Sequence, residues 1–354
     1  MKVHVDPHIR DTYRVFPAEG RGAYLRYDMN ENPEGLPAAF VQRVLREITP
    51  EFLATYPEPS RFLGKYASFL SVQPENLLAV NGSDMAIRYL METFGEEGKE
   101  IVSVAPTFEM YGVNASILGY RHVTVPYDEA LNVNVDDIVS AIGPDVRIVF
   151  LTNPNNPIGN VYTQDEIRRI ADRAEEVGAV VVVDEAYHYF YPESFVPYAL
   201  TRRNMIVLRT FSKLFSIAAL RLGIIIADPE LIGYIRNAKL TFDANSVALL
   251  FAERIIEEPG LTEELIRIEN EGKAYVLQEL EGNGYECRDC RGNFIFVRTK
   301  KDAHRVEEIL REEKKLLVHA YRHPLLRDFL RVSVGSRAAM ERFLKLFYEA
   351  ESEA

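Results

Sequence analysis

Residues 180–187 read Val-Val-Val-Val-Asp-Glu-Ala-Tyr, a run of branched apolar side chains that ends in two acids. This pattern is typical of a strand buried on both faces, because a strand with one wet face alternates apolar and polar residues. Further apolar runs of strand length lie at 77–80, 100–104, 121–125, 147–151, 205–209 and 222–227. Helical patterns at 85–93, 111–118, 135–142 and 164–177 separate several of them. We therefore expect an α/β fold with a large, mostly parallel, seven-stranded sheet that helices cover on both faces.

The pattern changes after about residue 245. An α+β order follows, with helices at 247–258 and 262–280, a strand at 293–297, a helix at 302–314, strands at 316–319 and 329–334, and a helix from 337. The first 35 residues, in contrast, show little helical periodicity. We expect an N-terminal arm (1–35), a large domain (36–245) and a smaller α+β C-terminal domain (246–354).

Composition restricts the class of function. The chain has 354 residues, 47% of them hydrophobic, and a formal net charge of −12. Such an acidic chain lacks the basic surface that nucleic-acid binding requires. No apolar run is long enough to span a membrane and the first residues lack a secretory segment, so we expect a soluble cytoplasmic protein. Cys287 and Cys290 have no second pair of ligands nearby, so we expect two reduced thiols and no metal site.

A lysine between apolar residues follows the strand at 205–209. Residues 210–215 read Thr-Phe-Ser-Lys-Leu-Phe, and Arg221 stands eight residues after Lys213. A shielded amine loses its charge more easily, so it can condense with a carbonyl group as a Schiff base. The neighbouring hydroxyls and Arg221 would then bind the phosphate of a phosphorylated aldehyde cofactor. The alternative is that Lys213 only extends from a helix end into water.

Asp184 lies at the carboxyl end of a predicted buried strand, where an acid is costly without a cationic partner. The protonated ring nitrogen of pyridoxal phosphate would be such a partner, and Tyr187 could donate to the phenolic oxygen of that ring. Acid pairs at strand ends also serve as metal or nucleotide ligands, so this motif alone does not decide the chemistry.

Three further loops follow predicted strands, where ligands of parallel sheets bind. Residues 152–159 read Thr-Asn-Pro-Asn-Asn-Pro-Ile-Gly, and we expect Asn156, held by the two prolines, to be a second donor to the phenolic oxygen. Phe108 is predicted to stack on the ring, with core packing as its alternative. The turn 81–84, Asn-Gly-Ser-Asp, predicts an anion site at a helix start, with an ordinary helix cap as the alternative.

These motifs resemble the fold-type-I, pyridoxal-phosphate-dependent aminotransferases, and within them the histidinol-phosphate aminotransferase branch. The resemblance covers nearly the whole chain, through Asn-Glu-Asn-Pro at 30–33, Asn-Gly-Ser-Asp at 81–84, Pro-Thr-Phe at 106–108, Asn-Pro-Asn-Asn-Pro at 153–157, Asp-Glu-Ala-Tyr at 184–187, Ser-Lys at 212–213, Gly-Asn-Phe at 292–294 and Leu-Arg-Val-Ser-Val-Gly at 330–335. It implies a homodimer that uses a small-molecule amino donor and a 2-oxo acid.

The resemblance also implies a role for each matched residue. Lys213 would carry the cofactor, Asp184 would bind the ring nitrogen, and Tyr187 with Asn156 would bind the phenolic oxygen. Phe108 would stack on the ring. The phosphate would be bound by Ser83, Asp84, Thr210, Ser212, Arg221 and, from the second subunit, Tyr56. The substrate would meet Arg331, which binds its carboxylate, and also Asn30 and His319.

The sequence departs from the family pattern in a few places. Ala219 and Ile158 stand where the family usually has Gly and Thr, which a backbone of negative φ tolerates. His319 stands where the branch commonly carries an arginine for the distal anion of the acceptor. Three other cations could replace that arginine, namely Arg14, Arg21 and Arg322.

The expected function is transfer of an amino group between an amino acid or amino-alcohol phosphate and a 2-oxo acid. The branch implies histidinol phosphate and 2-oxoglutarate as the pair. Two alternatives stay open: a decarboxylase that acts on an amino-acid phosphate such as threonine phosphate, and a non-catalytic protein that only binds the cofactor.

Overall fold

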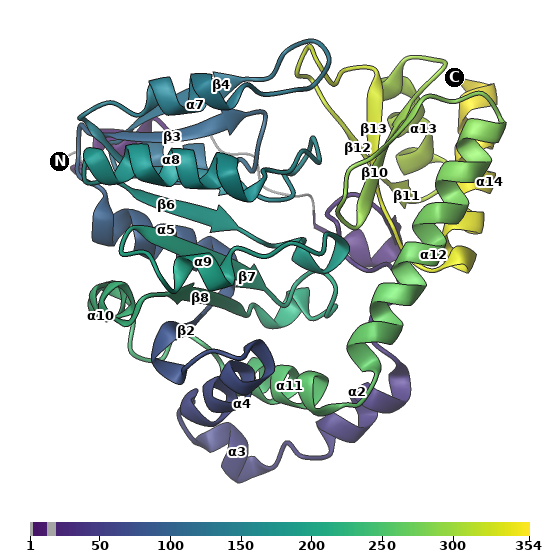
Figure 1. The fold of residues 1–354 in the computed structure, drawn as a ribbon. Coiled ribbons are helices and arrows are strands. Elements are labelled where there is room, and N and C mark those ends of the chain that lie inside the picture. The colour runs from purple at the N-terminus through teal and green to yellow at the C-terminus, as the bar shows by residue number, and fades with distance from the viewer. Residues whose placement is uncertain (1–2, 13–18) are drawn as a thin grey trace.

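The computed structural model describes residues 3–12 and 19–354 (Figure 1). Its centre is a seven-stranded sheet in the order β2-β8-β7-β6-β5-β3-β4. The strands are β2 (Leu77–Val80), β3 (Glu100–Ala105), β4 (Arg121–Pro126), β5 (Val146–Thr152), β6 (Val180–Asp184), β7 (Met205–Thr210) and β8 (Gly223–Ala227). Strand β8 runs antiparallel to both of its neighbours, whereas β3 to β7 are parallel to one another. The predicted large, mostly parallel, seven-stranded sheet is thus confirmed.

Alternate side chains of the strands other than the edge strand β4 face two separate apolar clusters, which explains the continuous apolar runs. In β6, Val181 and Val183 join one cluster and Val180 and Val182 the other. The first face is covered by α7 (Val135–Ala141), α8 (Gln164–Glu176) and α9 (Val196–Ala199), and the second by α5 (Gly82–Phe94), α6 (Met110–Ile117) and α10 (Pro229–Ala238). The sheet is therefore buried on both faces, as its composition predicts.

The C-terminal residues form a second sheet with its own core. The order of its strands is β12-β13-β10-β9. They are β9 (Cys287–Asp289), β10 (Phe294–Arg298), β12 (His319–Ala320) and β13 (Phe329–Ser333), packed against α12 (Leu261–Gly282), α13 (Ala303–Glu312) and α14 (Arg337–Glu353). In Figure 1 this unit faces the carboxyl ends of β3, β6 and β7, so the two units meet where ligands of parallel sheets bind.

The predicted strand 316–319 is wrong as a single element. Leu316–Leu317 forms β11, which pairs in parallel with β1 (Leu25–Arg26), whereas His319 pairs with Arg331 of β13. Val318, between the two pieces, is buried. The break occurs because the chain changes partners here, and one partner lies almost 300 residues earlier.

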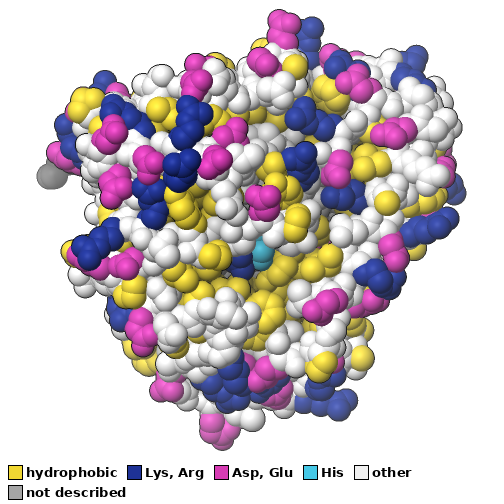
Figure 2. Space-filling view, viewed as in Figure 1, with side chains coloured by type: hydrophobic (Ala, Val, Ile, Leu, Met, Phe, Trp, Pro, Cys, Tyr) yellow, Lys and Arg dark blue, Asp and Glu magenta, His cyan; other side chains and the backbone are white. Residues whose placement is uncertain are grey.

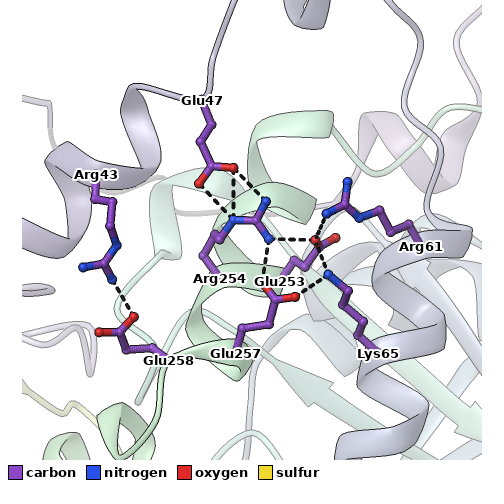
Figure 3. Close-up of polar contacts among 8 residues, drawn as sticks. All are labelled: Arg43, Glu47, Arg61, Lys65, Glu253, Arg254, Glu257 and Glu258. Atoms are coloured by element: carbon purple, nitrogen blue, oxygen red, sulfur yellow. Dashed lines mark hydrogen bonds and ion pairs between the residues drawn. The ribbon is translucent and has the colours of Figure 1, made fainter.

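Four helices lie below the sheet in Figure 1. They are α2 (Ala38–Leu45), α3 (Pro50–Ala54), α4 (Ser60–Leu70) and α11 (Ser246–Glu257). Apolar residues of α11, such as Phe251 and Ala252, belong to the same cluster as the first face of the sheet. Figure 3 shows acids and bases that connect α11 to α4 and to the end of α2. The domain boundary at residue 245 stays a prediction.

The remaining described elements are short. They are α1 (Pro7–Arg10) and the 3₁₀ turns η1 (Arg21–Ala23), η2 (Pro74–Asn76), η3 (His188–Phe190) and η4 (Ala218–Leu220). Ala219 lies in η4, and neither it nor Ile158 has positive φ, so both departures from the family pattern are tolerated by the backbone. No helix within 3–12 and 19–354 is both long and apolar enough to cross a membrane.

Candidate active site

The residues predicted at the carboxyl ends of the strands gather at one edge of the sheet. Thr152 ends β5, Asp184 ends β6 and Thr210 ends β7. Figure 2 shows a hollow in the middle of the surface, between the sheet and the C-terminal unit, with hydrophobic side chains along its lower side. The strands place the polar residues here because parallel strands present their carboxyl ends together.

Lys213 lies partly buried in the loop after β7. Its Nζ donates a 3.0 Å hydrogen bond to the backbone carbonyl of Met29, in the N-terminal segment. Burial and, to a smaller extent, the charge of Arg331 lower the pKa of Lys213 to about 8, against the opposite effects of Glu31 and Asp84. At pH 7 roughly a tenth of this amine is therefore neutral, far more than of an ordinary lysine. The neutral form is the one that attacks a carbonyl.

Asp184 is almost fully buried. Its Oδ2 accepts a 3.0 Å hydrogen bond from the Tyr111 hydroxyl and its Oδ1 a 3.1 Å bond from the amide of Ala186. Burial raises the pKa of Asp184 to about 6, and the charge of Lys213 acts on it from across the site. Within the described chain no basic group lies in ion-pair contact with Asp184, so the carboxyl lacks the cationic partner that its burial calls for.

Glu185, in contrast, points away from the site. Its carboxylate accepts hydrogen bonds from the guanidinium of Arg209, at 2.9 Å from Nη2, and from the amide of Phe195. Glu185 therefore belongs to a structural ion pair, whereas Asp184 has no cationic partner among the residues that the structure describes. This arrangement argues against the reading of residues 184 and 185 as paired ligands of one metal ion.

Tyr187 is buried beside the lysine. Its hydroxyl accepts a 2.9 Å hydrogen bond from Asn30 Nδ2, and Lys213 Nζ lies 5.9 Å from the centre of its ring. The ring packs edge-on against Phe294 of β10, at 5.2 Å between centroids. Burial raises the pKa of Tyr187, so the hydroxyl keeps its proton and is a donor at neutral pH.

A cationic cradle lies between the start of α5 and the loop after β7. Arg221 donates to Asp84 Oδ2 at 3.0 Å and lies 3.4 Å from Ser212 Oγ, which in turn accepts from Thr210 Oγ1 at 3.0 Å. Gly82 has φ of +76°, and a Cβ there would lie 2.5 Å from Arg221 Nη2. The guanidinium thus packs directly against Gly82 at the N-terminus of α5. A helix N-terminus and a cation at one place together suit the binding of a phosphate.

Asn156 and Arg331 are joined directly. Arg331 Nη1 donates to Asn156 Oδ1 at 2.8 Å, and its Nη2 donates to the carbonyl of Asp28. Arg331 Nε is buried without a hydrogen-bond partner among the described residues, and no acid there pairs with the guanidinium. The cation is consequently available to an anionic substrate.

The other predicted residues differ in their surroundings. Phe108 is half-buried and packs edge-on against Tyr111, at 5.8 Å. His319 is the cross-strand neighbour of Arg331 and contacts Tyr321. Tyr56, by contrast, is 72% exposed and stacks on Phe242 at 4.2 Å. Tyr56 is thus free for contact with another molecule.

Of the three cations that could replace the missing arginine, Arg14 lies outside the described residues. Arg21 donates to the carboxylates of both Asp28 and Glu31, at 2.6 and 2.8 Å from Nη2, so its charge is largely neutralised. Arg322 is exposed. Sequence reasoning also missed Tyr111, which lies in the first turn of α6 and donates to Asp184. Phe108 precedes that helix, so no helical spacing signalled the contact.

The site fits pyridoxal phosphate at each functional group. A buried acid without a cation suits a protonated ring nitrogen, a lysine of lowered pKa suits the aldehyde, and the cradle at Gly82 and Arg221 suits the phosphate. Tyr187 and Asn156 offer donors for the phenolic oxygen. These matches come from separate elements that meet at the sheet edge.

Comparisons with known proteins agree with the chemistry of the site. The family model for aminotransferase class I and II matches residues 28–347. The histidinol-phosphate aminotransferase of Clostridium novyi is 31% identical over 329 residues, covering 92% of this chain and 91% of the relative. That of Clostridium kluyveri is 32% identical over 322 residues, covering 90% of each chain.

Solved structures share the fold at lower identity. A histidinol-phosphate aminotransferase of Sinorhizobium meliloti in complex with pyridoxal 5'-phosphate has a TM-score of 0.89 at 20% identity, covering 100% of this chain and 99% of that one. The enzyme of Clostridium acetobutylicum has a TM-score of 0.83 at 22% identity, covering 93% and 100%. The chain belongs to the aminotransferase class I and II family and is a fold-type-I, pyridoxal-phosphate-dependent aminotransferase.

Proposed function

We propose that this aminotransferase moves the amino group of histidinol phosphate to a 2-oxo acid such as 2-oxoglutarate. The observation that carries the proposal is Arg331, a cation without an acidic partner among the described residues, beside the shielded amine of Lys213. A guanidinium binds phosphate and carboxylate with the same planar geometry, so one residue serves the donor and the acceptor in turn. The names of the relatives, at 31–32% identity, supply the choice of donor.

The residues of the site have distinct tasks in this proposal. Bound pyridoxal phosphate supplies an electron-withdrawing ring that makes the substrate Cα–H acidic. Lys213 Nζ holds the cofactor and then moves a proton at the substrate Cα, for which its pKa near 8 is suited. Asp184 keeps the ring nitrogen protonated, and Tyr187 donates to the phenolic oxygen.

The cofactor phosphate is held by the cradle described above. Arg221 and the hydroxyls of Thr210 and Ser212 supply a cation and donors, and the amides of Ser83 and Asp84 lie in the first turn of α5. Asn156 Nδ2 donates to the phenolic oxygen beside Tyr187, and Phe108 covers one face of the ring. His319, Asn30 and Arg331 contact the substrate.

The first experiment follows the half-reaction of the purified holoenzyme. Glutamate, aspartate, histidinol phosphate, phenylalanine and phosphothreonine are each mixed with it, and the visible absorbance of the lysine-bound cofactor is recorded. Rapid bleaching by histidinol phosphate is expected, and none in Lys213→Ala. Bleaching by another amine alone would contradict the proposed donor. Carbon dioxide release without a 2-oxo acid would favour the decarboxylase. The threonine-phosphate decarboxylase of Porphyromonas gingivalis shares only 19% sequence identity with this chain.

We also propose that the enzyme works in the cytoplasm as a homodimer in which Tyr56 reaches the phosphate site of the partner. Tyr56 and Phe242 form an exposed aromatic pair, and Leu53 and Leu240, 67% and 66% exposed, are among the most exposed large apolar residues. A dimer contact would remove this apolar surface from water.

A mixed-dimer experiment tests the exchange of Tyr56. Tyr56→Ala and Lys213→Ala are each expected to be impaired, because each leaves every site of its own dimer defective. After the two are mixed and their subunits exchanged, activity should return, because one site then receives Lys213 from one chain and Tyr56 from the other. Absence of recovery, with mixed dimers shown by mass spectrometry, would place Tyr56 in the site of its own chain or in neither.

A further inference from the structure

Glu269 is a buried acid on α12 that the proposed chemistry does not use. It is 1% exposed, and neither of its carboxyl oxygens has a hydrogen-bond partner within 3–12 and 19–354. Lys273, four residues further along the same helix, donates instead to Asp289 Oδ1 at 3.1 Å and to the carbonyl of Gly292 at 3.3 Å. An ionised carboxylate left in this state would be strongly destabilising.

The side-chain amide of Asn293 lies beside this carboxyl. Asn293 Nδ2 donates to the backbone carbonyl of Asn30 at 3.0 Å, which leaves Asn293 Oδ1 buried and without a donor in the described chain. Two acceptors, a carboxylate and an amide oxygen, cannot bond to each other. One proton on Glu269 removes the buried charge and gives Asn293 Oδ1 a donor. Burial raises the pKa of Glu269 well above its ordinary value, against the smaller effects of Asn293 and Lys273, which is consistent with that proton.

The contacts continue from Asn293 to the reaction site. Asn30, held in the left-handed region at φ 54°, donates from its backbone N–H to Ser333 Oγ at 2.8 Å and from Nδ2 to the Tyr187 hydroxyl at 2.9 Å. Because Tyr187 accepts from Asn30, its own O–H proton points elsewhere. The open direction is toward the site, where the proposed function places the phenolic oxygen of the cofactor.

We propose that Glu269 is a positioning residue that stays protonated and donates to Asn293 Oδ1, thereby fixing the direction of the hydrogen bonds from Asn293 through Asn30 to Tyr187. The relay holds Asn293 so that Nδ2 donates to the Asn30 carbonyl. Asn30 then presents Nδ2 to Tyr187, and Tyr187 is left to donate into the site. The proposal rests on the proposed role of Tyr187, and the experiment below separates the two.

The test is a spectrophotometric pH titration of the holoenzyme, which reads the proton affinity of the lysine-bound cofactor. A donor to the phenolic oxygen stabilises the unprotonated form, so losing it raises the midpoint. Glu269→Ala and Asn293→Ala are each expected to raise the midpoint by about half a pH unit or more, and together by no more than either alone. Glu269→Gln, which keeps a neutral donor, is expected to keep the wild-type midpoint.

Two results would overturn the relay: a shift in Glu269→Gln as large as that in Glu269→Ala, which would require an ionised carboxylate, or no shift in Glu269→Ala. Tyr187→Phe is titrated in parallel. If it shifts the midpoint and Glu269→Ala does not, the relay alone fails; if Tyr187→Phe causes no shift, the role of Tyr187 fails and the relay with it.

A second measurement does not require Glu269→Ala and compares only the wild-type protein with Glu269→Gln. Infrared spectra of wild-type protein at neutral pH should contain the carbonyl stretch of a protonated carboxylic acid that is missing from Glu269→Gln. If the two spectra are identical in that region, Glu269 is ionised and the proposal is wrong, even where Glu269→Ala does not fold.

Discussion

Arg331 Nη1 donates a 2.8 Å hydrogen bond to Asn156 Oδ1, which joins the C-terminal sheet to the loop after β5. The bond fixes the orientation of the Asn156 amide, because the oxygen faces Arg331 and Nδ2 is directed elsewhere. It also means that the residue proposed for the substrate and the residue proposed for the cofactor ring share one contact. A change at Arg331 should therefore affect both.

Arg331→Lys should raise KM for the 2-oxo acid by about tenfold or more, because a lysine cannot hold Asn156 and a carboxylate in one plane. Steady-state kinetics with the acceptor varied measure the effect. The matched control is Arg327→Lys, whose side chain is 70% exposed and which should keep KM within about twofold. An unchanged KM in Arg331→Lys would remove Arg331 from the substrate site.

Gly82→Ala should weaken cofactor binding by about tenfold or more, because the new Cβ would lie 2.5 Å from Arg221 Nη2 and displace the guanidinium. Titration of the apoenzyme with pyridoxal phosphate gives the dissociation constant. Gly98→Ala is the control, since Gly98 also has positive φ, +79°, but an open space around its Cβ. Both variants carry the backbone strain of about 1 kcal/mol, so equal affinities would show that the cradle is not the phosphate site.

The strands were predictable because each is a continuous apolar run between turn residues. Val180 to Val183 illustrate this, since both faces of β6 meet an apolar cluster. The pairing of Leu25 with Leu316 was not predictable. Strands of two residues are too short to show an alternating pattern, and these two lie far apart in the sequence. The sequence did not predict helix α4, although Phe62 and Tyr66 have helical spacing. Pro57 and Pro59, just before it, indicate an extended path instead.

The candidate site was predictable to the extent that it lies at strand ends. Asp184 and Thr210 end their strands, and the rule for parallel sheets brings them together. The hydrogen bond from Tyr111 to Asp184 spans 73 residues and that from Asn293 to Asn30 spans 263, so neither follows from spacing. The first depends on how α6 packs on the sheet, and the second on how the C-terminal unit meets the N-terminal segment.

Asp184→Asn should stabilise the apoenzyme at pH 7, although it removes the carboxylate that would bind the ring nitrogen of the cofactor. Burial raises the folded-state pKa of Asp184 from 3.8 to about 6. The carboxyl therefore adds fully to the free energy of unfolding below pH 3.8, and this contribution is lost as pH rises through 6. An asparagine does not titrate, so the free energy of unfolding of Asp184→Asn should exceed that of the wild-type apoprotein by about 2–3 kcal/mol at pH 7. Urea unfolding of both apoproteins at pH 7.5 and pH 4.5 measures it, and the advantage should shrink at the lower pH. An advantage independent of pH would mean that the carboxyl titrates normally.

Arg254→Met should destabilise the protein by about 1–3 kcal/mol, because Arg254 bridges Glu47 after α2 to Glu253 and Glu257 on α11. Figure 3 shows the bases on α4 that share these acids. The arginine side chain is only 22% exposed, so water and salt screen its charge weakly. Methionine keeps much of the apolar stem, which limits the change to the charge and its hydrogen bonds.

The control for this network is Arg267→Met. Arg267 also binds two acids, Glu264 and Glu271, but its side chain is 53% exposed and all three residues lie on one helix. An exposed pair within a helix contributes about 0.5 kcal/mol or less, so Arg267→Met should hardly change the midpoint of urea unfolding. Because the network of Arg254 connects separate helices, its loss should also lower the cooperativity of unfolding. Equal effects of the two variants would show that the ion pairs of α11 contribute no more than a solvated surface pair, and that apolar packing alone holds α2 and α4 against α11.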